Sequence, residues 1–245
     1  MPYRRRRRYK RRYRKGQYRR RRYGKAYKAR RYWTAVVRRT KMPLRWMPQR
    51  KTLTLKYNSL ANYDPGQGLL QAIVFRANSC YDPDQTGAGA QPRGFDQLVG
   101  TFYNSCTVVA SVIKVRFSGQ ANATAVGWRC GVTVSNSSVA TDDFQDYLEN
   151  NTTSHGTMGS GHSSKALIIK NQAGIGKWFG RPTNQIIGNE DFITTSSGNP
   201  TEEVFYHVWV SANDKRATTD AGQCEGEVTI WYRIVCTDPI YPENS

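Results

Sequence analysis

Residues 228–236 read Val-Thr-Ile-Trp-Tyr-Arg-Ile-Val-Cys, and this run gives the clearest indication of the fold class. Apolar side chains occupy every second position, at Val228, Ile230, Tyr232, Ile234 and Cys236. Successive side chains of a β-strand point to opposite faces, so this alternation predicts a strand with one buried face. β-branched and aromatic residues also suit such a pleated, half-buried surface. The run therefore predicts an antiparallel strand that lies on a core.

The same alternation recurs from Lys51 onward, interrupted by clusters of Gly, Asn, Asp, Pro and Ser that mark turns. Clear runs occupy residues 52–57, 113–118, 128–135 and 204–210, and weaker runs occupy 69–77, 166–170 and 177–187. Helical periodicity is convincing only at 142–148, with a second turn expected at 95–103. About eight strands with almost no helix predict an all-β sandwich or jelly roll, because two antiparallel sheets bury one face of each strand.

Three connections, at 78–94, 135–164 and 194–200, are longer than a hairpin needs. Long connections on a rigid sandwich often contact neighbouring subunits or receptors. Tolerated insertion is the alternative for each of them, and the sequence leaves both open.

Charge is divided unevenly along the chain. Of the 37 Lys and Arg residues, 23 lie within positions 1–50, which contain no Asp or Glu and carry a formal charge of +23. Residues 51–245 hold 14 basic and 18 acidic residues, a formal charge of −4. The cations of the first segment repel one another, and its aliphatic surface is too small to offset the loss of chain entropy on folding. We therefore expect this segment to be disordered when unbound. We therefore predict a basic arm at 1–48 and a folded domain at 49–245.

Aromatic residues interleave with the charges of the arm, at Tyr3, Tyr9, Tyr13, Tyr18, Tyr23, Tyr27, Tyr32, Trp33 and Trp46. Arginine binds phosphate oxygens in pairs and releases counterions, and tyrosine offers a flat face to an unstacked base. Bases in a duplex are already stacked, so the pattern favours single-stranded nucleic acid. Part of the run can also serve as a nuclear localisation signal, which needs only about five to eight basic residues.

The residues expected to bind nucleic acid are mainly the arginines and tyrosines of this arm. They are Arg4, Arg5, Arg6, Arg7, Arg8, Tyr9, Lys10, Arg11, Arg12, Tyr13, Arg14, Lys15, Tyr18, Arg19, Arg20, Arg21, Arg22, Tyr23, Arg30, Arg31, Tyr32, Arg38, Arg39, Arg45 and Arg50. The last four lie nearest the folded domain, where we expect them on the inner wall of a shell.

No catalytic, metal or cofactor site is predicted, and the chain is not expected to be an enzyme. The five cysteines are an odd number without a C-x-x-C pair, which predicts reduced, partly buried thiols. His155 and His162 lack the spacing of a zinc site, and His207 is expected to be a strand residue. Residues 174–177 only partly match a phosphate loop. The chain has no run of about 18 apolar residues, so no membrane insertion is expected.

Four motifs resemble the capsid proteins of circoviruses and related viruses with circular single-stranded DNA genomes. They are MPYRRRRRYKRRYRK at 1–15, GFDQL at 94–98 followed by Phe102-Tyr103, VIKVRF at 112–117 and TIWYRIV at 229–235. The resemblance implies an eight-stranded jelly roll, a shell of sixty copies with icosahedral T=1 symmetry, and arms that point inward to the DNA genome. It also implies location in the virion and the host nucleus, with nuclear import receptors and a host-cell receptor as further partners.

The charge of the arm agrees in size with this expectation. Sixty copies of residues 1–50, at +23 each, supply about 1,400 positive charges, enough for most phosphates of a genome of roughly 1.5–2 kilobases. Two other readings stay open: a capsid protein of a small RNA virus or satellite, and a cellular RNA-binding or chromatin protein with a basic tail.

Overall fold

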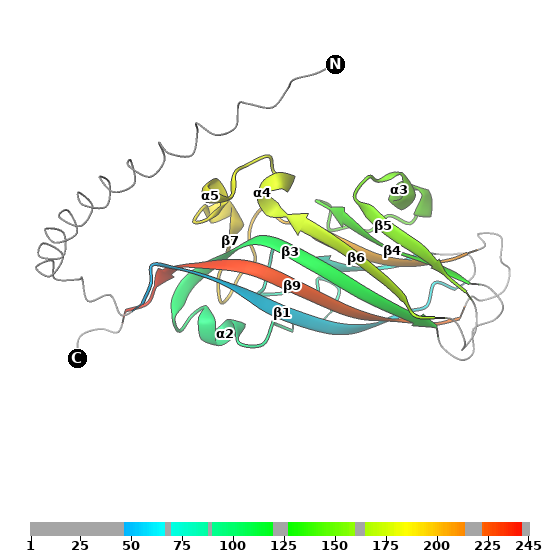
Figure 1. Ribbon diagram of the computed structural model, residues 1–245, viewed down its shortest axis with the longest axis horizontal. Coiled ribbons are helices and arrows are strands. Elements are labelled where there is room, and N and C mark those ends of the chain that lie inside the picture. The colour runs from blue at the N-terminus through cyan, green and yellow to red at the C-terminus, as the bar shows by residue number, and fades with distance from the viewer. Residues whose placement is uncertain are drawn as a thin grey trace, which may run out of the picture. The chain divides into compact units, whose positions relative to one another are not determined.

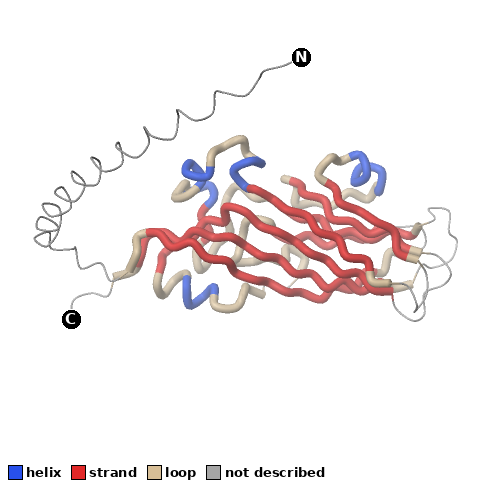
Figure 2. Tube along the Cα trace, in the orientation of Figure 1, coloured by secondary structure: helices blue, strands red, loops and turns tan. Residues whose placement is uncertain are grey.

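The computed structural model describes residues 47–66, 70–87, 90–119, 127–159, 165–213 and 222–241. All of them belong to the compact unit that begins at Met47. Strands make up most of this unit, and its helices are short (Figure 2).

Two antiparallel sheets form the described domain (Figure 1). The first has the order β1 (Arg50–Tyr63), β9 (Cys224–Pro239), β3 (Tyr103–Gly119) and β6 (Leu167–Gly174), and the short β7 (Ile193–Thr194) also pairs with β3. The second has the order β2 (Leu70–Arg76), β8 (Phe205–Ala212), β4 (Trp128–Ser135) and β5 (Thr153–Met158).

The pairing of these strands is that of a jelly roll. Apart from β7, the first strand pairs with the last, the second with the next to last, and so on inward: β1 with β9, β2 with β8, β3 with β6, and β4 with β5. The chain is thus one long antiparallel hairpin folded over on itself, and successive strands in each half of the hairpin alternate between the two sheets. The predicted eight-stranded jelly-roll sandwich is confirmed.

The core fills the space between the two sheets. From the first sheet, Ile113, Val115 and Phe117 are fully buried, as the alternation of residues 113–118 predicted. From the second sheet, Val132 and Val208 join the same apolar cluster. Residues at alternating positions of both sheets therefore interdigitate in one core, which is the packing expected of a sandwich.

Strand β8 is buried on both faces, although a half-buried strand was predicted at 204–210. Its outer face is covered by α3 (Phe144–Glu149), whose Tyr147 ring stacks on Trp209 at 5.4 Å between ring centroids. Gly131, directly opposite Trp209 on β4, makes room for the indole, since a Cβ there would lie 2.2 Å from it. Both faces of β8 are therefore buried, because each packs against a separate apolar cluster.

His207 joins β8 to the loop that precedes α3. The carbonyl oxygen of Ser137 can only accept, so Nε2–H of His207 donates to it, at 2.7 Å. Nδ1 must then accept from the hydroxyl of Tyr147, at 3.0 Å. His207 is 2% exposed, and this burial lowers its pKa below the usual value for histidine. The strand position predicted for this residue is confirmed, and the ring is held in its neutral form.

This burial predicts a loss of stability in mild acid. A group whose pKa is lower in the folded state stabilises the fold above its unfolded pKa, which is about 6.5 for histidine. The free energy of unfolding should therefore fall as pH drops below about 6.5. Chemical denaturation from pH 7.5 to 5 measures this change, and a His207→Leu variant should lose the part of the slope that arises here. An unchanged slope in that variant would contradict the assignment.

The predicted strand at 177–187 is wrong, because the structure places α4 (Ile175–Trp178) and α5 (Thr183–Ile186) there. Gly180 has a positive φ of 64° and Pro182 follows it, so the chain turns where a strand would have to continue. The segment 135–164 is also more than a connection, since it contains α3 and β5. The turn expected at 95–103 is helical only in α2 (Phe95–Leu98), and η1 (Glu190–Phe192) adds one 3-10 turn.

All five cysteines are free and fully buried, rather than partly buried as predicted. Burial raises the pKa of the Cys236 thiol to about 11, which keeps it protonated at neutral pH. The thiols thus pack as small apolar groups.

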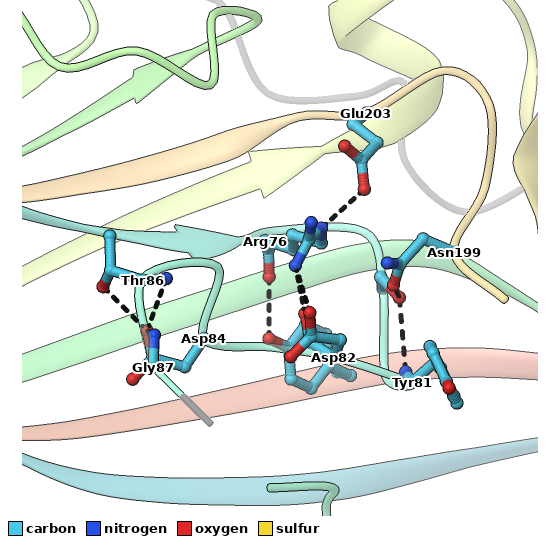
Figure 3. A network of polar contacts seen from close by, with 10 residues as sticks. Arg76, Tyr81, Asp82, Asp84, Thr86, Gly87, Asn199 and Glu203 are labelled. Carbon is cyan, nitrogen blue, oxygen red and sulfur yellow. Dashed lines mark hydrogen bonds and ion pairs between the residues drawn. The ribbon is translucent and has the colours of Figure 1, made fainter. Parts of the chain in front are cut away.

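A polar network joins the end of β2 to two loops (Figure 3). The guanidinium of Arg76 contacts Asp82 at 2.7 Å through Nη1 and Glu203 at 2.6 Å through Nε. The side chains are only 13% exposed for Arg76, 27% for Asp82 and 23% for Glu203. The Tyr232 hydroxyl of β9 donates to the Arg76 carbonyl oxygen at 2.7 Å, so the network also links the two sheets.

Candidate nucleic-acid interface

Within the described residues, the outer face of the β1–β9–β3–β6 sheet is a candidate surface for binding a polyanion. In Figure 1 this sheet lies in front, and none of the described helices crosses it. Its outward side chains are identified by alternation: Ile113 and Val115 are buried, so Lys114 between them points away from the core. Arg233 points outward for the same reason, because it lies between the buried Tyr232 and Ile234.

The strand register brings four cations together on this face. Three adjacent rows cross the sheet in the order β1, β9, β3 and β6, and their positions pair directly. The rows are Thr54–Arg233–Ala110–Gly174, Lys56–Trp231–Val112–Gln172 and Asn58–Thr229–Lys114–Lys170. We call Lys56, Lys114, Lys170 and Arg233 the cationic face. No carboxylate occurs in these three rows, so the cationic face has a local excess of positive charge.

Lys114 and Lys170 are direct cross-strand partners. Directly opposed side chains have Cβ atoms about 4.5–5.5 Å apart, and like charges in such a pair destabilise a sheet. A bound phosphate would offset this repulsion. The pair is therefore better suited to binding an anion than to stabilising the fold.

In the rows beyond Asn58, the outer face carries carboxylates at Glu227 and Glu225 of β9. Glu227 faces Arg116, but their closest charged atoms are 3.9 Å apart and both side chains are 56% exposed. Such a pair contributes little, about 0–1 kcal/mol. The cationic face is therefore bounded by acidic residues at one end and not neutralised by them.

Arg50 is the one predicted nucleic-acid-binding residue within the described part of the chain. It is exposed, is the first residue of β1 and pairs with Thr237 of β9. Alternation back from Lys56 through Thr54 puts Arg50 on the same side of the sheet as the cationic face. The other predicted residues, from Arg4 to Arg45, lie outside the described residues.

The four members of the cationic face were not among the predicted binding residues. The alternation of residues 113–118 predicted that Lys114 points away from the core. The pattern of one strand, however, does not show which cations of other strands become its neighbours. That information lies in the pairing of β1, β9, β3 and β6, which are far apart in the sequence.

Other kinds of site find no support in the described residues. No group of three or more His, Cys, Asp and Glu side chains within them could hold a metal ion. His155 is an exposed residue of β5, and His162 lies outside the described part. Over the same residues, no helix has the length and apolar character needed to cross a bilayer.

Comparisons with known proteins find similar solved structures. No protein-family model and no curated protein matches the chain. A structure of Desmodium yellow mottle tymovirus is 12% identical with a TM-score of 0.41, over 84% of this chain and 98% of that one. For mud crab tombus-like virus the values are 10%, 0.41, 85% and 99%, and for the decameric BFDV capsid protein they are 10%, 0.42, 77% and 99%.

Proposed function

We propose that this chain is a structural capsid protein that assembles into a small shell around a nucleic-acid genome. The observation that carries the proposal is the joining of a jelly-roll domain to a segment with 23 cations and no carboxylate. A nearly neutral body can pack against copies of itself, whereas such a segment would hold them apart unless a polyanion neutralised it. The two parts therefore suit assembly and genome binding respectively.

The partner in assembly is a second copy of the chain, and the proposed shell has sixty copies. The described domain carries long connections between β2 and β3 and between β4 and β5, which can supply contacts between subunits or to a host-cell receptor. A sphere tiled by sixty such domains would be about 20 nm across. These dimensions suit a genome of the size that the arms can neutralise.

The proposed genome is single-stranded DNA, and both the arm and the cationic face would bind it. Counterion release from phosphates supplies most of the affinity, and the arm tyrosines favour unpaired bases. DNA rather than RNA rests on the resemblance to circular single-stranded DNA viruses. The same basic arm can carry the protein to the host nucleus through import receptors, before it is incorporated into virions.

Negative-stain microscopy of the expressed full-length protein, combined with nuclease treatment, tests the proposal. We expect closed particles about 20 nm across whose nucleic acid, once extracted, is degraded by DNase and not by RNase. Extracted RNA would favour a capsid protein of an RNA virus or satellite instead. Monomers or small oligomers in the presence of viral-length single strands would contradict the capsid function and favour a cellular nucleic-acid-binding protein.

The cationic face predicts that one substitution strengthens the fold while it weakens binding. Lys170→Glu converts the opposed Lys114–Lys170 pair into an attractive one, which should raise the free energy of unfolding by about 0.5 kcal/mol. The substitution also removes a phosphate contact, so the slope of log affinity against log salt for single strands should become shallower by about 0.7 or more.

Denaturant titration and binding at several salt concentrations measure the two effects. Arg93→Glu is the matched control, because Arg93 is exposed and lies in the loop before α2 rather than on this sheet. If the salt slope changes equally in both variants, the cationic face is not part of the binding surface.

A further inference from the structure

Trp231 is unlike the other tryptophans in the described part of the chain. Trp128 and Trp209 are fully buried in apolar clusters, and Trp178 packs against the core. Trp231 is partly exposed and lies between the buried Ile230 and Tyr232, so its ring stands on the outer face of the sheet. An indole in that position contributes little to the core and is accessible to a ligand.

The register surrounds Trp231 with cations. Lys56 on β1 is its direct partner, Val112 on β3 is its partner on the other side, and Arg233 is two residues along the same strand. Lys114 is diagonal to Trp231 across β3. Diagonal neighbours in a sheet are about 7–8 Å apart, which is within reach of a lysine or arginine side chain. The indole therefore lies among three cations, in three rows of the sheet that hold no carboxylate.

This charge distribution argues against a second copy of the same face as the occupant. A symmetric contact would bring two cationic faces together and place eight like charges in one interface. A polyanion with flat apolar groups complements both features of the surface. Single-stranded nucleic acid has that chemistry, because each nucleotide carries one phosphate and one exposed base face.

We infer that Trp231 is a stacking site for an unpaired base, and that Lys56, Lys114 and Arg233 bind the phosphates of the same strand. The site distinguishes single strands from duplexes, because paired bases are already stacked and cannot lie on the indole. This inference rests on the proposed function, and it assigns an ordered binding site to the folded domain in addition to the basic arm.

The experiment uses full-length protein and a thirty-nucleotide oligo(dT) in which single thymines are replaced by 5-iodouracil, which forms photo-crosslinks with aromatic rings. We expect a crosslink on the peptide that contains Trp231, reduced at least tenfold when the strand is first annealed to its complement. At about 0.5 M salt, where phosphate contacts are weakened, Trp231→Leu should bind single strands about tenfold more weakly.

The choice of variants separates stacking from structure. Leucine keeps apolar surface on the sheet and removes the π-face, whereas Trp231→Phe keeps a smaller π-face and should retain most of the crosslink yield and affinity. Thermal melting of both variants checks the fold. Equal binding by the leucine and phenylalanine variants would overturn the inference, as would equal crosslinking of single and double strands.

Other outcomes separate this inference from the proposed function. If particles form and package nucleic acid but the crosslink is absent from Trp231, the stacking site is wrong and the capsid function stands. If Trp231→Leu blocks association of subunits without changing the crosslink pattern, the face is an interface between copies and the inference is overturned. If the unsubstituted protein neither assembles nor packages, the proposed function itself fails.

Discussion

Removal of residues 1–46 is expected to abolish packaged nucleic acid and to leave a folded β domain. The deletion removes 22 of the 37 basic residues, because the 23 cations of positions 1–50 include Arg50. It retains Met47, which packs against the core. Each phosphate contact to a single strand contributes about 0.7 to the salt slope, so losing even ten contacts would weaken binding by several orders of magnitude at physiological salt.

Absorbance at 260 and 280 nm of nuclease-treated particles measures this loss. The matched control keeps the length and charge of the arm and replaces its seven tyrosines with leucine. We expect that control to package nucleic acid and to discriminate less between single strands and duplexes. Equal packaging by the truncated and full-length proteins would contradict the role assigned to the arm.

Replacement of Arg76 by alanine is expected to lower the free energy of unfolding by about 2–3 kcal/mol. The guanidinium contacts two carboxylates in a mostly buried site, and its removal leaves Asp82 and Glu203 close together without a cation. Removing one partner of a buried pair costs about 3–5 kcal/mol, and the partial exposure of both carboxylates reduces that value. The loop that contains Asp82 and the loop that contains Glu203 and leads into β8 should loosen together, because the Arg76 side chain contacts both of them.

Chemical denaturation at pH 7 measures the effect, and Arg116→Ala is its control. Arg116 also faces a glutamate, but at 3.9 Å and with 56% of each side chain exposed, so its loss should cost less than about 1 kcal/mol. A triple variant, Arg76→Met with Asp82→Asn and Glu203→Gln, should recover part of the stability by removing the unpaired charges. Similar costs for Arg76→Ala and Arg116→Ala would show that the network is not specially stabilising.

Strands with a strict apolar alternation could be predicted from the sequence alone. The runs at 113–118 and 228–236 became β3 and β9, the two central strands of one sheet. Strand β5 was missed because its residues, Thr-Ser-His-Gly-Thr-Met, lack that alternation. It forms through pairing with β4, where Val132 lies opposite Ser154, so tertiary context rather than local preference determines it.

A short apolar run led to a predicted strand, at 177–187, that the structure does not contain. Residues 177–187 contain Trp178, Phe179 and Ile186, which suit a buried strand and a buried helical turn equally well. Gly180 and Pro182 decide between them by turning the chain.

The candidate site was harder to predict than the fold. Charge segregation predicts the arm from composition alone, and this stays a prediction because residues 1–46 lie outside the described residues. The cationic face depends on which residues become cross-strand neighbours, as Lys56 and Trp231 do. That pairing could not be predicted from the alternation within each strand.

We propose that the folded domain builds the shell and that the cationic segment fills it with a single-stranded polyanion. Charge-detection mass spectrometry of particles purified from cells that express the full-length chain tests both parts of this proposal in one measurement. We expect sixty polypeptides plus a nuclease-resistant mass equal to about 1,400 nucleotides, because each of the 23 positive charges of residues 1–50 in the sixty copies would meet one phosphate. Closed particles with the mass of protein alone, or subunits that stay monomeric with single strands at low salt, would contradict it.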